Sequence, residues 1–348
     1  MRQQKRLVRK LKTPHLALPE TFDVVFEMMD LVKEERPIVL DGLFKLDGLY
    51  FSSWVPWEDN LIFNRLWPDD PRTIPQYSLR LYYFNDVVSS LKTMSFYLSN
   101  LFGMPPTALF FPCRFYETDD IKKIMDIYCT KETNINSLEL SNYPRNATTD
   151  DDEVLTLILK QQNATSNLHL LFKPTLNFTF DFKTLRNTPK HLEIEYSAWV
   201  TWEQLLSLES ETVCLLKSNF PSSDFKTLIE TWRDGWTPKW KSLMVEFKTS
   251  LDIDSYVSDE FKEIESGKER QKSIFLRDSS IQAYRFTTRI ITARNVVDKT
   301  GYHLTRSDQT IATVTMENEN IGWFHIQSND PNAEMFIPVT KPELLFFN

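Results

Sequence analysis

Pairs of apolar residues separated by a single residue recur along this chain, and no other feature constrains the fold as strongly. Successive pairs lie 21 to 30 residues apart, and segments with a helical period stand between them. The pairs are Leu79/Leu81, Leu109/Phe111, Leu138/Leu140, Leu168/Leu170, Leu192/Ile194, Val213/Leu215 and Leu243/Val245. This alternation predicts short strands, and the helical segments between them predict crossovers that make the strands parallel.

Polar residues mark the expected starts and ends of the intervening helices. Thr118, Thr149 and Ser222 each stand just before a segment that contains aspartate, and Thr201 is followed two residues later by a glutamate. Hydroxyl oxygens accept hydrogen bonds from the free amides at a helix N-terminus, and carboxylates there suit the helix dipole. Gly235 is expected to end a helix, because glycine tolerates the left-handed backbone of that position.

A strand followed by a helix buries its apolar edge by stacking on neighbouring units of the same kind. We therefore predict an α/β fold: an irregular leucine-rich-repeat-like solenoid with a parallel sheet and outer helices, followed by a C-terminal β-rich segment. The Leu-x-Leu-x-x-Asn pattern of such repeats is met loosely, near Asn142 and Asn219. A compact open α/β sheet is the alternative.

The same patterns suggest a domain organisation. Residues 13–78 are interpreted as an N-terminal cap, 79–267 as the strand and helix repeat region, and 268–348 as the β-rich segment. Within the last segment, residues 307–309 are expected to form the turn of a hairpin, because extended apolar stretches lie on both sides.

Glycine is scarce, which argues against nucleotide chemistry. The chain has seven glycines, whereas average usage would give about 24. They are too dispersed for a phosphate-binding loop, which needs clustered glycines so that the backbone can approach the anion. We therefore expect no nucleotide cofactor, and no other cofactor is indicated.

The distribution of charge argues against nucleic acid as a partner. The formal net charge is −8, and the first twelve residues carry six positive charges, which leaves −14 on the remainder. A nucleic-acid-binding protein needs a positive surface that releases counterions. No apolar run is long enough to cross a membrane, and no secretory signal is seen. We expect a cytoplasmic or nuclear protein, with reduced thiols at Cys113, Cys129 and Cys214.

The residue types that carry catalysis do not form a known motif. The histidines and cysteines show no HExxH or CxxC spacing, and no Gly-x-Ser-x-Gly motif is present. His169 and His191 are therefore interpreted as ordinary sheet or turn residues. We expect no metal site and no enzyme activity, and an enzyme of unfamiliar type is kept as a third hypothesis.

Carboxylates alternate with the apolar residues of several predicted strands. Because neighbouring residues of a strand point to opposite faces, these carboxylates are expected on the open face of the sheet. A protein partner is the ligand that such a face would bind. The predicted partner-binding residues are Glu139, His169, Glu193, Glu195 and Glu246.

The segment from Ala198 to Leu208, with Leu228-Ile229-x-x-Trp232 and Trp240-Lys241-Ser242-Leu243, resembles the F-box-associated type 2 domain of the large nematode F-box families. Residues 300–313 resemble the C-terminal segment of that family, in which Asp-Gly-Thr is usual and Gln309 replaces the glycine. The resemblance covers roughly residues 85 to 320. Its motif residues, interpreted as structural, are Trp199, Trp202, Leu205, Trp232 and Trp240.

The resemblance implies a function. F-box proteins of this kind dock on a Skp-type adaptor of a cullin ubiquitin ligase, and their associated domain recruits the target. Residues 1–12 resemble a remnant of the closing helix of an F-box, with Lys5, Arg6, Leu7 and Val8 at its centre. The helices that would bind the adaptor have no counterpart here. We therefore expect a substrate-receptor module that binds a protein target, with a stand-alone interaction or competitor protein as the alternative.

Overall fold

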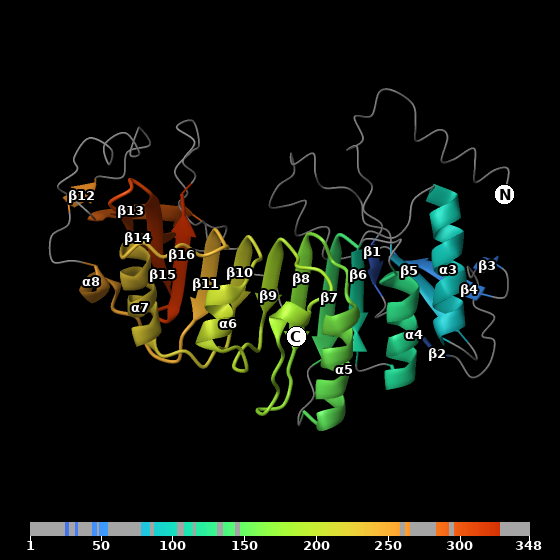
Figure 1. Cartoon of the computed structure of the whole chain (residues 1–348). Helices are drawn as coiled ribbons and strands as arrows, with labels where there is room; N and C mark the ends of the chain where they lie inside the picture. Colours follow the sequence, from blue (N-terminus) through green and yellow to red (C-terminus); the bar gives the residue numbers. More distant parts are fainter. Residues whose placement is uncertain are drawn as a thin grey trace. The chain divides into compact units, whose positions relative to one another are not determined.

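The computed structural model describes residues 25–27, 32–33, 44–46, 49–54, 78–83, 87–102, 108–113, 116–130, 135–142, 147–257, 262–264, 283–291 and 296–327. The fold is mixed α/β (Figure 1). No helix in these ranges is long and apolar enough to span a membrane.

The chain divides into two compact units. The first comprises Met1–Arg145, Glu153–His169 and Leu185–Asn187, and the second comprises Asn146–Asp152, Leu170–Thr184 and Thr188–Asn348.

In the first unit, the parallel strands β1, β6 and β7 follow one another in one sheet. A second sheet has the order β2-β5-β4-β3. The strands are β1 (Val25–Glu27), β2 (Val32–Lys33), β3 (Phe44–Leu46), β4 (Leu49–Trp54), β5 (Ser78–Tyr83), β6 (Ala108–Pro112) and β7 (Ser137–Asn142). The helices are α3 (Val87–Phe102), α4 (Thr118–Tyr128) and α5 (Thr149–Gln161), the last of which begins in the second unit.

The second unit contains parallel and antiparallel strands. Strands β9, β10 and β11 are parallel, β16 pairs antiparallel with β11, and β15, β14 and β13 continue the antiparallel series. The strands are β9 (His191–Ile194), β10 (Thr212–Leu215), β11 (Ser242–Glu246), β12 (Lys262–Ile264), β13 (Ala283–Ile291), β14 (Val296–Thr305), β15 (Ile311–Glu317) and β16 (Ile321–Ile326). Strand β8 (Asn167–Phe172) is divided between the two units after His169.

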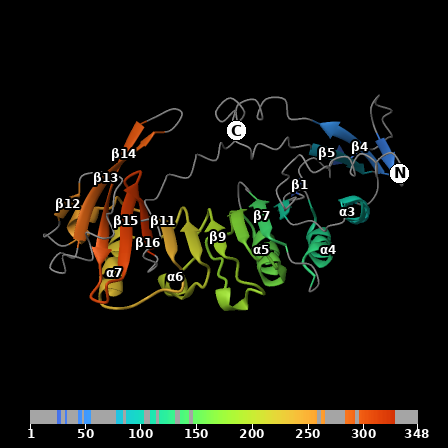
Figure 2. The same cartoon turned by 90° about the horizontal axis from the view of Figure 1, so that it is seen from above.

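Helices cover one face of the sheet in the second unit. They are α6 (Trp202–Ser207), α7 (Ser222–Arg233) and the short α8 (Ile253–Tyr256), and a 3-10 turn, η3 (Phe182–Thr184), precedes β9. Figure 2 shows α6 and α7 on the same side of β9, β10 and β11. We call this side the helix face and the opposite side the second face.

The apolar pairs predicted from the sequence lie in strands. Six of the seven pairs, from Leu109/Phe111 to Leu243/Val245, are buried in β6 to β11, with exposed fractions of at most 2%. The pair Leu79/Leu81 is also in a strand, β5, but that strand pairs with β4 and β2 in the separate sheet. The prediction that it joins the other pairs is wrong, because alternation specifies a strand but not its neighbours.

The helix starts are correct to within one residue, although the capping side chains differ. Thr201 caps α6 as predicted, in a capping box with Gln204. Thr118 and Ser222 are instead the first residues of α4 and α7, which have no side-chain cap from the preceding residue. Before α5, Thr148 rather than Thr149 exchanges hydrogen bonds with Asp151.

Gly235 ends α7 as predicted. Its φ is +107°, its N–H donates to the carbonyl of Trp232, and the next N–H, of Trp236, donates to the carbonyl of Thr231. These two hydrogen bonds satisfy helix carbonyls that would otherwise have no partner.

Arg306 joins the end of α7 to the hairpin formed by β14 and β15. Its side chain is 8% exposed, and Nη1 donates to the carbonyls of Trp232 and Trp236 at 3.4 and 3.2 Å. Its Nη2 donates to Asp308 Oδ2 at 2.6 Å. The hydrogen bonds from Arg306 to the Asp308 carboxylate hold the pKa of Asp308 below its usual range. The antiparallel pairing of β14 with β15 confirms the predicted hairpin. The buried guanidinium of Arg306, which is paired with Asp308, joins this hairpin to α7.

Candidate protein-binding surface

Two of the predicted partner-binding residues lie in the first unit. Glu139 in β7 and His169 in β8 alternate with buried leucines, and both are partly exposed. The Oε2 of Glu139 lies 3.5 Å from Nδ1 of His169. The structure therefore brings these two side chains together.

The other three predicted residues, Glu193, Glu195 and Glu246, lie in the second unit. Glu193 is half-buried on the second face in β9, where it stands beside Cys214 of β10 in register. Glu195 follows the end of β9 and is only 8% exposed. Glu246 is the last residue of β11. The expectation that all these carboxylates line an open face is therefore wrong for Glu195, which is buried.

Lys217 connects Glu195 and Glu246. Its Nζ lies 2.5 Å from Oε1 of Glu195, and its backbone N–H donates to Oε2 of Glu246 at 2.9 Å. Burial alone would lower the pKa of the ammonium, but the hydrogen bonds with Glu195 and Tyr196 outweigh burial, and the pKa is raised. Lys217 adopts φ of +47°, a left-handed conformation that is uncommon for a residue other than glycine.

Aromatic and basic side chains complete this cluster. The Nζ of Lys217 lies 4.0 Å from the ring centre of Tyr196, and the Nζ of Lys173 lies 5.9 Å from the same ring. These distances are within the range of cation–π attraction. Lys173, Tyr196 and Lys217 were not recognisable from the sequence, because each lies just beyond a strand and the three meet only in the folded chain.

Serine side chains tie the loops that follow neighbouring strands. Ser197 Oγ donates to the carbonyl of Leu216 at 2.7 Å, and Ser218 Oγ donates to the carbonyl of Glu246 at 2.5 Å. Asn219, which the sequence singled out, donates to the carbonyl of Ala198 at 2.8 Å. The loops beside the cluster are therefore held by hydrogen bonds from one strand unit to the next.

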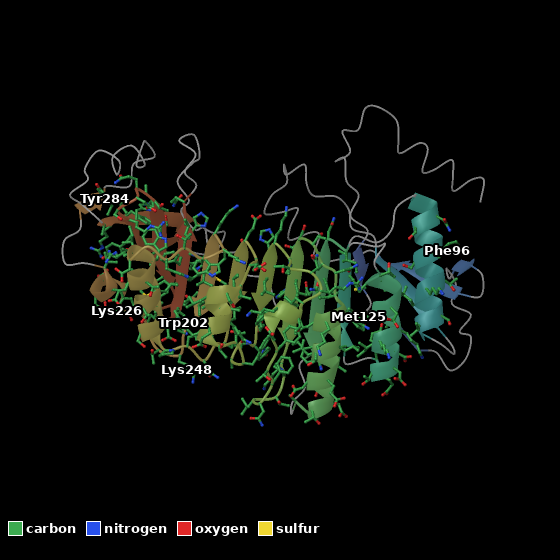
Figure 3. The ribbon with its side chains drawn as sticks, viewed as in Figure 1. Phe96, Met125, Trp202, Lys226, Lys248 and Tyr284 are labelled. Atoms are coloured by element: carbon green, nitrogen blue, oxygen red, sulfur yellow. The ribbon has the colours of Figure 1, made fainter. Side chains whose placement is uncertain are left out.

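The tryptophans singled out in the sequence lie mainly in the core of the second unit. Trp199, Trp232 and Trp240 are at most 8% exposed, and Leu205 is fully buried. Trp232 and Trp240 pack edge-on against Phe324 of β16, with ring centres 5.7 and 5.9 Å apart. Trp202, labelled in Figure 3, is only half-buried and packs against Phe220.

Trp199 belongs to a second aromatic cluster. Its ring is stacked on Phe182 of η3 with centres 5.4 Å apart and meets Phe178 edge-on at 5.0 Å. The amide of Gln204 donates to the carbonyl of Phe180, which ties this loop to α6. The long connection between β8 and β9 is therefore an ordered part of the helix face.

Other predicted features carry less information. The proposed F-box remnant at Lys5, Arg6, Leu7 and Val8 lies outside the described residues. Cys113, Cys129 and Cys214 are buried free thiols, and burial raises the pKa of Cys129 to about 12. In the described part of the chain, no three His, Cys, Asp or Glu side chains are grouped to hold a metal ion.

Comparison with known proteins identifies a family for part of the second unit. Residues 180–245 match the family model described as F-box associated. The matched segment runs from the Phe178 to Phe182 loop to β11 and contains α6, α7 and Lys217. No curated protein and no solved structure matches the chain. The structure and the comparisons thus define a mixed α/β protein with one segment, residues 180–245, that is similar to F-box-associated domains.

Proposed function

We propose that the chain is a protein-binding substrate receptor, similar to the target-recruiting part of an F-box ubiquitin-ligase subunit. The match of residues 180–245 to the F-box-associated family model carries this proposal. In proteins that this segment resembles, the associated domain holds the target while another part of the protein contacts the ligase. In this proposal the chain binds without catalysing a reaction, and it acts in the cytoplasm or nucleus.

The proposed target-binding residues lie on strands of each unit, where they alternate with buried apolar residues. Glu139 and His169 are partly exposed in the first unit, and Glu193 is partly exposed on the second face of the second unit. Glu195 and Glu246 support the surface from its border, because both are engaged by Lys217. Partly exposed polar side chains on rigid strands suit specific recognition, since little conformational entropy is lost on binding.

We also propose that the repeated units are leucine-rich-repeat-like. Ser197 and Ser218 each stand three residues after the second apolar residue of a strand, which is the place of Asn in the Leu-x-Leu-x-x-Asn pattern. Each hydrogen-bonds to the backbone of the next unit. These bonds support stacking of similar units, in which each unit stabilises its neighbour.

The test is a binding measurement with surface variants. Proteins enriched by the full chain over an unrelated bait would be identified, and the best candidate purified and titrated against the chain. Glu139→Lys and Glu193→Lys are each expected to weaken binding by roughly fivefold or more, because they reverse a charge in the interface. Glu195 is left intact, since its substitution would leave Lys217 without its buried partner.

Asp126→Lys serves as the matched control, because Asp126 is an exposed carboxylate on α4. It reverses the same charge away from the proposed face and should leave the affinity unchanged. Full-strength binding by both glutamate variants would show that the target binds elsewhere.

The alternative is a stand-alone interaction or competitor protein that binds targets without delivering them for ubiquitination. It shares the match of residues 180–245 to the F-box-associated family model and differs in whether the chain joins a ligase. Copurification with a purified Skp-type adaptor distinguishes the two. A one-to-one complex contradicts the competitor function, and no complex at micromolar concentrations contradicts membership of a ligase.

A further inference from the structure

Lysines follow the ends of three strands at one edge of the sheet in the second unit. Lys173 follows β8, Lys217 lies two residues after β10, and Lys248 lies two residues after β11. Because β9, β10 and β11 are parallel, their carboxyl ends meet at this edge. Figure 3 shows Lys248 projecting from the edge. We call Lys173, Tyr196, Lys217 and Lys248 the carboxyl-end edge.

Two lysines at the opposite edge of the same strands form ion pairs. Lys239 pairs with Glu209, and Lys241 Nζ lies 3.5 Å from Oε2 of Glu211. These residues precede β11 and β10, so each of the two lysines has a carboxylate on the neighbouring unit. The amino ends of β10 and β11 therefore present balanced charge.

At the carboxyl-end edge, the three lysines outnumber the two carboxylates that contact Lys217, namely Glu195 and Glu246. Lys173 and Lys248 are exposed, and neither has an ion-pair partner in the described ranges of the chain. Lys217 does have one, Glu195, but the carboxylate is 10% exposed and the ammonium side chain is 45% exposed. A binding partner would therefore meet the ammonium groups before it met the carboxylate.

The position of Lys217 is fixed before any partner binds. Its ammonium is held by Glu195 and lies over Tyr196, and its backbone is held by Glu246. Long lysine side chains usually lose entropy when they are ordered in an interface, and a side chain that is already held loses less. The left-handed φ at this residue is a strained conformation of the kind found at functional sites.

We infer that the carboxyl-end edge binds an acidic segment of the target protein, through the ammonium groups of Lys173, Lys217 and Lys248. The inference rests on the proposed function and names the chemistry of its partner. Carboxylate side chains of an extended segment recur about 7 Å apart on one face, and neighbouring strands are about 4.8 Å apart. An extended acidic segment that crosses the strand ends therefore places carboxylates within range of lysines on different strands.

The test uses the full chain and a fluorescently labelled hexaglutamate peptide, with binding followed by anisotropy at low salt. The double variant Lys173→Glu/Lys248→Glu should weaken binding roughly tenfold, because two exposed attractions become repulsions. The control is Lys190→Glu/Lys241→Glu, which makes the same change in net charge at two exposed lysines that directly precede β9 and β11, at the opposite edge. Its effect should stay below about twofold, since distant exposed charges are screened.

Equal weakening by both double variants would overturn the inference, because binding would then follow net charge alone. A hexameric thymidine oligonucleotide that binds more tightly than hexaglutamate would also overturn it, because the edge would then select phosphate. The identified target separates the two proposals. If that target binds the Lys173→Glu/Lys248→Glu variant with unchanged affinity, the carboxyl-end edge is not the binding site, and the proposed function stands. If the chain captures no specific target, the proposed function fails and the inference fails with it.

Discussion

The parallel and antiparallel strands of the second unit form one continuous row of side chains on the second face, yet burial changes along it. His191 in β9 is exposed, Thr212 in β10 is half-buried, and Ser242 in β11 is 7% exposed. Farther along the same row, Thr313 in β15 and His303 in β14 are fully buried. The second face is thus accessible beside β9 and β10 and closed beside β15 and β14, so we expect the proposed partner to bind beside β9 and β10.

The antiparallel strands also provide most of the packing beneath α7. Phe324 of β16 contacts two tryptophans, and Gly322 leaves room for Phe225, whose ring lies 2.9 Å from the position of an added Cβ. The buried residues of β9 and β10 are instead smaller, mainly aliphatic side chains, such as Leu192, Ile194 and Val213. We therefore expect the antiparallel strands to contribute more to the stability of the second unit. The parallel strands β9 and β10 are then available for the proposed binding of a protein partner.

The largest expected effect compares two tryptophans on the helix face. Trp232 is fully buried between Phe324 and Arg306, whereas Trp202 is half-buried. Trp232→Ala should lower the free energy of unfolding by about 3–5 kcal/mol, as expected for a large cavity. Trp202→Ala should cost less than half as much. Urea unfolding measures both, and a larger loss at Trp202 would reverse the comparison.

Gly301 tests whether the second face is closed at β14. A Cβ at this position would lie 2.5 Å from Cγ2 of Thr315 and 2.7 Å from the carbonyl oxygen of Val314. Because the carbonyl cannot move easily, Gly301→Ala should cost about 1–3 kcal/mol. Thr212→Ile adds bulk to the same face in β10, where the side chain is half-buried, and should be nearly neutral. Similar losses for the two variants, measured by thermal unfolding, would mean that both parts are equally packed.

The pH dependence of the free energy of unfolding tests the same difference in burial, between His303 of β14 and His191 of β9. Burial lowers the pKa of His303 to about 3, below the ordinary value of 6.5. The folded state therefore binds this proton less readily than the unfolded state, so stability is complete above pH 6.5 and is lost as pH falls towards 3. At pH 5 the loss from His303 should be about 2 kcal/mol.

The measurement is urea unfolding at pH 7 and pH 5. His303→Gln should remove that part of the pH dependence, and His191→Gln, in the same row but exposed, is the matched control. An unchanged pH dependence in His303→Gln would show that His303 is not buried in solution.

The sequence predicted the strands better than their surroundings. Pairs such as Leu192/Ile194 were recognisable because one buried face imposes a period of two, whichever strand lies beside them. The pairing of β16 with β11 was not recognisable, since it joins residues about 80 positions apart. His303 and Thr313 alternate with apolar residues just as half-exposed strand residues do, so their complete burial left no local signal.

The candidate site was predicted only in part for a related reason. Glu193 and Glu246 were found because they alternate with core residues. Lys217 was missed because its importance comes from contacts with Glu195, Tyr196 and Glu246, which follow or end other strands. Alternation reports which face a strand residue occupies, but it gives no information about the loops beyond the strand.

The smallest expected effect compares two residues with left-handed backbone, one in each part. Gln309, in the turn between β14 and β15, has φ of +68°, and Lys217, beyond β10, has φ of +47°. A left-handed conformation costs a residue with a Cβ about 1–2 kcal/mol, and glycine avoids that cost but loses about 0.5–1 kcal/mol in chain entropy. Gln309→Gly, which restores the Asp-Gly-Thr of the resembled family, should therefore stabilise the protein by about 0.5 kcal/mol.

Lys217→Gly relieves the same backbone strain but should destabilise the protein, because Glu195 would remain buried without its ammonium partner. Thermal unfolding of both variants gives the two signs directly. If Lys217→Gly were as stabilising as Gln309→Gly, the lysine side chain would have no part in holding the folded chain. Opposite signs would mean that the left-handed backbone at Gln309 is strain without a compensating side-chain contact. At Lys217 the same strain would be offset by the contacts that the side chain makes with Glu195 and Tyr196.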